Sequence, residues 1–203
     1  MPARSPHILS DQLAAWLQSK QPKTLASLIE LFQDKSFAVI IMLCMFLPAL
    51  PLPTGGLTHV LEIVTVVLAA EQVVGLRRLW LPAFLANRIK LGSLLQGKLG
   101  GALLRRLRWF EKHSSPRGRW VFRLPLATRL QAAIIIGLTV AAFLAPPFSG
   151  LDTLPSLGVV MISLAYLLED AWLLLAGLLI GALGVFLSVG LGAVIVHFVH
   201  RLL

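Results

Sequence analysis

Five long segments that carry almost no charge limit what this chain can fold into more than any other feature. They cover residues 37–50, 57–70, 130–145, 154–168 and 171–199. Only 13% of the residues are charged and the mean hydropathy is +0.84, whereas soluble domains carry about twice that share of charge. Lipid is therefore the solvent that this chain fits. We expect an all-α, polytopic membrane bundle with about 5–6 membrane segments.

The charged residues are unevenly distributed along the chain. The net charge is +9, and 13 of the 18 Lys and Arg residues lie in the interval 77–129, where Glu111 is the only acid. A sequence pI near 10.9 would suit a nucleic-acid partner, but these basic residues flank apolar segments. The positive-inside rule explains that pattern better. We expect a lipid bilayer as the partner, no nucleic acid, and a cytoplasmic N-terminus.

These patterns divide the chain into four regions. Residues 1–35 read as cytoplasmic amphipathic helices, 36–76 as a first membrane hairpin, 77–126 as a basic cytoplasmic amphipathic segment, and 127–203 as a second hairpin with one or two C-terminal membrane helices. The start lacks a long apolar stretch, so no cleavable signal peptide is expected. The N-terminal helices either pack on the membrane domain, which we favour, or insert Trp16 at the headgroup level.

The arms of the first hairpin are short for a membrane. Each has 14 residues, or about 21 Å of helix, against a hydrocarbon core of roughly 30 Å. The segment between them, residues 51–56, cannot be helical, because proline removes backbone donors and glycine permits positive φ. The hairpin either thins the bilayer or is re-entrant, with its tip held inside protein. The tip residues are Pro51, Pro53, Gly55 and Gly56.

The second hairpin has the same order of parts. Residues 130–145 form one arm and 154–168 the other, and its tip contains Pro147, Gly150 and Pro155. Internal repeats around a central site, often inverted, are a recurrent transporter design. The alternative is that any two helical hairpins with turn residues look alike. The last segment, 171–199, is either one tilted helix or two helices bent at glycines, and its Gly177 and Gly181 form a GxxxG motif that permits close helix packing.

The acids in these apolar segments are candidates for a substrate or ion pathway, because an ionisable residue inside a membrane is energetically costly. Glu62 lies five residues past Leu57, and His59 is three residues earlier on the same helical face. The pair could share a proton, bind a cation, or simply hold the hairpin tip together. Asp152 adjoins the second tip and would face the first if the repeats are symmetric. The remaining acids lie at arm ends, where they could instead pair with arginines: Glu71, Glu169 and Asp170.

Motifs of enzymes and metal sites are missing from the sequence. It contains no G-x-S-x-G, HExxH, Walker or GxGxxG pattern, and its five histidines are scattered. The single cysteine, Cys44, can form no internal disulfide or thiolate cluster and is expected to be a packing residue. We therefore expect no enzymatic activity, no catalytic residues, no metal and no cofactor.

Several short motifs occur along the chain. They are Leu50-Pro51-Leu52-Pro53-Thr54-Gly55, Gln72 with Gly75, Trp80-Leu81-Pro82, Pro146-Pro147-Phe148, Leu154-Pro155 and Leu167-Leu168-Glu169-Asp170. Together these motifs resemble those of the ExoD family of bacterial membrane proteins. The resemblance covers roughly residues 8–200, although the family pattern has a small or apolar residue near Glu62 and a glycine where Ala171 stands. It adds Gln72 to the candidate pathway.

The resemblance implies a multi-pass protein of the bacterial inner (cytoplasmic) membrane that supports exopolysaccharide synthesis. One hypothesis is that the two tips bind or move an ion or a lipid-linked carrier, with a basic face that attracts anionic lipid headgroups. The alternative is a scaffold that does not transport but organises a polysaccharide synthase. A homo-oligomer is compatible with both hypotheses.

Overall fold

The computed structural model describes residues 8–32, 35–51, 56–76, 98–115, 117–145 and 150–202. Within these ranges every regular element is an α-helix, so the predicted all-α class is confirmed. The tip residues Pro53, Gly55 and Pro147 lie outside the described residues. The helices are α1 (Ile8–Gln18), α2 (Leu25–Phe32), α3 (Ser36–Phe46), α4 (Leu57–Val74), α7 (Lys98–His113), α8 (Arg119–Arg123), α9 (Pro125–Phe143), α10 (Thr153–Leu168) and α11 (Ala171–Leu202).

Helix length and hydropathy agree with a membrane protein. Three described helices are long and apolar enough to cross a bilayer, over 57–74, 126–143 and 171–190. The helices α3 and α10 are also apolar but shorter. The 11 residues of α3 extend only about 16 Å at 1.5 Å per residue. A helix of that length does not cross the hydrocarbon core alone, so α3 must be covered by protein at its sides.

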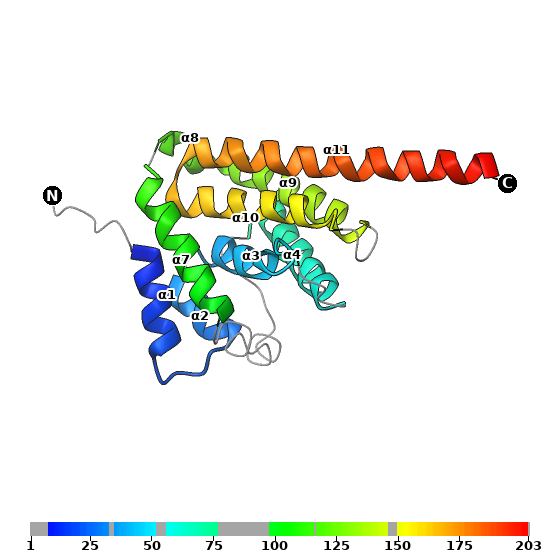
Figure 1. Ribbon diagram of the computed structural model, residues 1–203. Helices are drawn as coiled ribbons and strands as arrows, with labels where there is room; N and C mark the ends of the chain where they lie inside the picture. The colour runs from blue at the N-terminus through cyan, green and yellow to red at the C-terminus, as the bar shows by residue number, and fades with distance from the viewer. Residues whose placement is uncertain are drawn as a thin grey trace.

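Four helices form a ring. The helix α3 packs on α4, α4 on α9, α9 on α10, and α10 back on α3, while α11 lies against the outside of α10 and also contacts α9 (Figure 1). All but one of the 11 residues of α3 are buried. By contrast, α4, α9 and α11 each expose a row of large apolar side chains. Those rows form the apolar surface of the bundle, and α3 and α10 are the shielded helices.

The ring has two chemically different ends. At one end, which we call the basic end, Lys35 before α3 donates a hydrogen bond to the Leu167 carbonyl of α10, and Gly75 after α4 adjoins Arg129 of α9. At the other end, the tip end, the His59 ring of α4 lies 5.0 Å from the Phe143 ring of α9. Both hairpins therefore open at the basic end and turn at the tip end.

The two hairpins use their arms differently. The short, buried helix comes first in the hairpin α3–α4 but second in the hairpin α9–α10. Internal duplication stays a prediction. The final segment is a single helix of 32 residues, which resolves the choice between one helix and two. Figure 1 shows α11 continuing well past the tip end of the other helices.

The water-compatible helices run across the basic end. In Figure 1, α1 and α7 lie crosswise to α9, α10 and α11, with α1 on α7 and α2 on α3. Trp16 is buried and its indole N–H donates to the Ser27 hydroxyl at 3.1 Å. The N-terminal helices thus pack on neighbouring helices rather than inserting Trp16 into headgroups. Residues 119–123, near the end of the basic segment, form the short helix α8.

Candidate functional site

The His59–Glu62 pair lies in the first turns of α4. Gly56 begins this helix with φ of +75°, a left-handed conformation that glycine adopts without strain. The 3.6-residue period then places His59 and Glu62 on one face. The imidazole Nδ1 lies 2.8 Å from the carboxylate Oε2, which is hydrogen-bonding distance. Local helix geometry alone is therefore enough to form the pair.

The two partners differ sharply in exposure. The Glu62 side chain is 1% exposed, whereas the His59 side chain is 39% exposed and rests its ring edge-on against Phe143. His59 therefore lies at the boundary between the surroundings and the interior, with Glu62 behind it. An acid that is buried this completely is costly unless it is paired or protonated. The arrangement places a proton-exchanging side chain next to a shielded carboxyl group.

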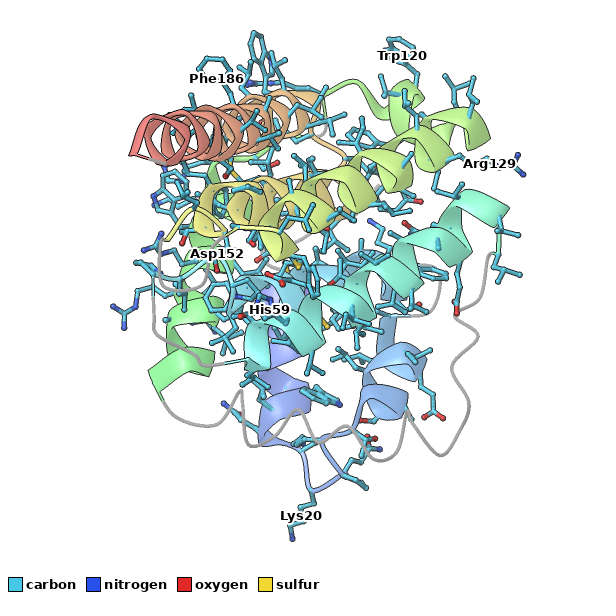
Figure 2. The ribbon with its side chains drawn as sticks, turned by 90° about the vertical axis from the view of Figure 1, so that its right-hand side faces the viewer. Lys20, His59, Trp120, Arg129, Asp152 and Phe186 are labelled. Atoms are coloured by element: carbon cyan, nitrogen blue, oxygen red, sulfur yellow. The ribbon has the colours of Figure 1, made fainter. Side chains whose placement is uncertain are left out.

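The second hairpin brings an acid to the same end. Asp152 immediately precedes α10 and interacts electrostatically with Glu62. Figure 2 views the molecule from the tip end, where His59 and Asp152 are both near the viewer. Gly150 turns the chain into α10 with φ of +70°. The tips of both hairpins thus place titratable side chains at the same end of the ring, with the His59–Glu62 pair on one hairpin and Asp152 on the other.

Hydroxyl groups extend this site into the ring. Within the described residues, four buried side-chain oxygens have no hydrogen-bond partner: Glu62 Oε1, Thr65 Oγ1, Ser156 Oγ and Ser163 Oγ. Leaving one such group unsatisfied costs about 1–3 kcal/mol. Thr139 is also fully buried, but its hydroxyl donates to the Ile135 carbonyl of its own helix at 2.7 Å. The four unpartnered oxygens therefore mark the part of the interior where a polar ligand or water would be stabilised.

The other predicted pathway residues lie at the basic end. Glu169 ends α10 and is 3.8 Å from the Lys35 ammonium. Asp170 accepts hydrogen bonds from Ser114 and Ser115 and from the Trp172 backbone N–H. Glu71 and Gln72 are in the last turn of α4. The structure therefore separates these four residues from His59, Glu62 and Asp152 by most of the length of the bundle.

The described tip residues have different positions. Pro51 is exposed just after the first arm, and Gly56 and Gly150 form the turns into α4 and α10. Pro155 is in the first turn of α10 rather than in the connecting loop, and it packs against Gly184 of α11. Proline is tolerated there because the first helical N–H groups have no intrahelical acceptor.

Sequence reasoning missed the hydroxyl groups of Thr65, Ser156 and Ser163. Their spacing carried a usable signal, since Ser156 and Ser163 are seven residues apart and therefore share one helical face. It also missed Glu111, which accepts hydrogen bonds from the backbone N–H groups of Leu9 and Ser10. The position of Glu111 as a lone acid in a basic segment was the sequence signal for this structural role.

A separate apolar pocket of about 120 Å³ lies among α8, α9, α10 and α11. Its wall includes Phe122, Ile134, Ile162 and Leu174, and polar atoms contribute little to it. A cavity with this lining suits a hydrocarbon chain rather than a sugar or an ion. Within the described ranges, no three His, Cys, Asp or Glu side chains lie close enough together to hold a metal ion.

The fold and its site define an integral membrane protein whose helical hairpins enclose a small polar interior. The chain belongs to the ExoD family, described as "Exopolysaccharide synthesis, ExoD", whose model matches residues 9–190. It is also similar to an uncharacterized protein of Synechocystis sp., slr1875, with 27% identity over 181 residues, covering 87% of this chain and 78% of that protein. No solved structure matches it significantly. The family membership links the chain to exopolysaccharide synthesis.

Proposed function

We propose that this protein supports exopolysaccharide synthesis in the bacterial inner membrane by binding or moving a small polar ligand at the tip end of its bundle. The main support for this proposal is the environment of the Glu62 carboxyl group. Within the described residues, this carboxyl group is shielded, has one oxygen without a partner, and bonds through the other oxygen to the half-exposed His59. An intramembrane acid of this kind favours a role in a substrate or ion pathway.

The ligand is either an ion or the headgroup of a lipid-linked carrier. The His59–Glu62 pair suits the ion, and the apolar pocket near Phe122 suits a carrier's hydrocarbon tail. The two sites are at different ends of the bundle. A carrier would therefore place its tail near the basic end, where the exposed arginines of α7 attract phosphate.

Replacement of Glu62 by Gln tests this proposal. The exchange keeps the shape of the side chain and its hydrogen bonding but removes its ability to bind and release a proton. In a strain that depends on this protein, we expect Glu62→Gln to reduce exopolysaccharide at least tenfold with an unchanged amount of protein in the membrane. Glu30→Gln is the matched control, because Glu30 is exposed on α2 and should have no effect.

The alternative is a scaffold for a polysaccharide synthase. It is supported by a stripe of exposed apolar side chains on α11 that includes Leu179 and Phe186, which a partner helix could cover as readily as lipid. Under this alternative, Leu179→Ala with Phe186→Ala lowers exopolysaccharide while Glu62→Gln leaves it intact. The reverse result supports the ligand proposal and excludes the scaffold as the sole function.

A further inference from the structure

The interior of the four-helix ring contains more polar groups than the tip site alone requires. In the ring, α4 and α10 lie opposite one another, because each packs on α3 and on α9. Side chains of α4 and α10 that face away from lipid and from α11 therefore point to a common interior. Which side chains reach this interior depends on which face of α4 and which face of α10 point into the ring.

Close contacts of glycines show which face of α10 packs on α11. A Cβ on Gly158 would collide with Gly181 of α11, and one on Gly177 of α11 would collide with Ile162. At 100° per residue, Ser156 and Ser163 lie about 140–160° around the helix from Gly158. Both serines therefore face the ring interior, and both are fully buried.

The buried and exposed side chains of α4 show which face of this helix points into the ring. Glu62 and Thr65 are fully buried, whereas Ile63 and Val67 are more than half exposed. Glu62 and Thr65 therefore face the same interior as the two serines. The oxygens that have no partner among the described residues thus come from two helices on opposite sides of the ring.

These oxygens are arranged in depth. Both α4 and α10 run from the tip end to the basic end. Counting about 1.5 Å per residue, Glu62 and Ser156 lie within the first two turns, and Thr65 and Ser163 lie roughly one to two turns deeper. Buried groups without protein partners are commonly bonded to internal water. Water between these levels would connect the tip site towards the basic end.

We propose that this interior is a proton path that begins at His59, passes to Glu62, and continues through water held by Thr65, Ser156 and Ser163. The proposal rests on the proposed function and names its ligand as the proton. A hydroxyl group both donates and accepts a hydrogen bond, so a hydroxyl–water chain can relay protons. A divalent cation does not fit, because no cluster of three ligating side chains is found among the described residues.

The first transfer is a proton exchange within the pair. Protonated His59 gives its Nδ1 proton to the carboxylate Oε2 at 2.8 Å, which leaves a neutral imidazole and a neutral carboxylic acid. The charged groups near Glu62 are His59 on its own helix and Asp152 ahead of α10. In the halves of α3 and α9 nearer the tip end, the buried side chains with a polar or titratable group are Cys44 and Thr139, and neither carries a charge.

Proton flux into liposomes tests the path directly. The full-length protein is reconstituted with an internal pH-sensitive dye, and a potassium diffusion potential drives protons inward. We expect wild-type liposomes to acidify at least tenfold faster than empty ones, and Glu62→Gln to return the rate to the empty-liposome background. Size-exclusion profiles of each variant show whether it is folded.

Two threonines supply a matched comparison. Thr65 and Thr139 are equally buried, but the Thr65 hydroxyl has no partner while Thr139 bonds to its own helix. We expect Thr65→Val to slow the flux at least fivefold and Thr139→Val to change it less than twofold. Equal rates in both variants, or wild-type flux equal to that of empty liposomes, overturn the path.

This result is separable from the test of the proposed function. If Glu62→Gln abolishes exopolysaccharide but the wild type carries no proton flux, the site binds another ligand and only the proton path is wrong. If the wild type carries flux that Glu62→Gln abolishes, yet the same variant makes normal exopolysaccharide, the path stands and the proposed function is wrong.

Discussion

At the scale of single residues, Gly158 controls how closely α10 and α11 approach. A Cβ at this position would lie 2.6 Å from the Gly181 Cα and 3.0 Å from the Gly177 carbonyl oxygen. Both neighbours are backbone atoms, so relief requires the helices to separate. We expect Gly158→Ala to destabilise the protein by about 1–3 kcal/mol, measured as a lower thermal unfolding midpoint in detergent.

Gly137 provides the control for this substitution. It lies inside α9, and a Cβ there meets nothing within 4 Å. We expect Gly137→Ala to leave the midpoint unchanged or to raise it slightly, because alanine favours a helix over glycine. A midpoint for Gly158→Ala no lower than that for Gly137→Ala would contradict the role of the close contact between α10 and α11.

The sequence predicted contacts within one helix better than contacts between helices. The spacing of His59 and Glu62 predicted that they lie on one face, since a helix fixes the i,i+3 relation by itself. The Gly177–Gly181 motif predicted close packing but not that Gly158 lies opposite. That pairing depends on how two helices align, and the periodicity of one helix contains no information on its neighbour.

At the scale of elements, Glu111 anchors α1 to α7. Its Oε1 accepts hydrogen bonds from the Leu9 and Ser10 backbone N–H groups at 2.8 and 3.1 Å, and it therefore caps the first turn of α1 from another helix. We expect Glu111→Ala to speed hydrogen–deuterium exchange of the α1 amides at least tenfold while exchange in α10 stays unchanged. Glu30→Ala on α2 is the control and should leave both unaffected.

The exposed face of α7 is expected to bind anionic lipid. Arg105 and Arg106 are exposed, opposite the buried Leu103 and Leu107, and α7 crosses the basic end, where headgroups would lie (Figure 1). Each basic side chain near an anionic surface contributes about 1 kcal/mol. Wild-type protein should melt at a higher temperature in phosphatidylglycerol nanodiscs than in phosphatidylcholine nanodiscs.

Neutralising that face should remove the lipid dependence. We expect Arg105→Gln with Arg106→Gln to abolish most of the difference between the two lipids without lowering the midpoint in phosphatidylcholine. Lys20→Gln, a change at an exposed site between α1 and α2, should keep most of it. A lipid difference that survives the double substitution would contradict this role for α7.

The apolar arms were predicted to within a few residues, since a charge-free segment bounded by proline or glycine has few alternatives. The first arm is a partial exception: α3 ends at Phe46 rather than at residue 50. Nothing in the sequence indicated that α3 and α10 would be the covered helices and α4 and α9 the exposed ones. Exposure is decided by which further helices pack on the ring: α11 lies on α10, and α2 lies on α3.

At the scale of the whole molecule, charge and polarity are divided between the two ends. Lys35, Arg129 and α7 lie at the basic end, whereas the described charged and titratable groups nearest the turns are His59, Glu62 and Asp152. The sequence predicted this division through the positive-inside rule, because basic loops alternate with charge-poor ones. It could not show that α4 packs against α9, which brings the turns of both hairpins to the same end of one ring.

This division predicts the orientation of the protein in the membrane. The positive-inside rule places the basic end in the cytoplasm, and both hairpins then return to that side. Single cysteines in a Cys44→Ala background test this, with Lys112→Cys on the exposed side of α7 and Leu57→Cys at the tip end. We expect a membrane-impermeant maleimide to label Lys112→Cys only after the cells are permeabilised.

If the tips are re-entrant, Leu57→Cys stays unlabelled from outside, because lipid and protein surround it. Labelling of Lys112→Cys in intact cells would reverse the orientation, and rapid labelling of Leu57→Cys from outside would show that the hairpins cross the bilayer.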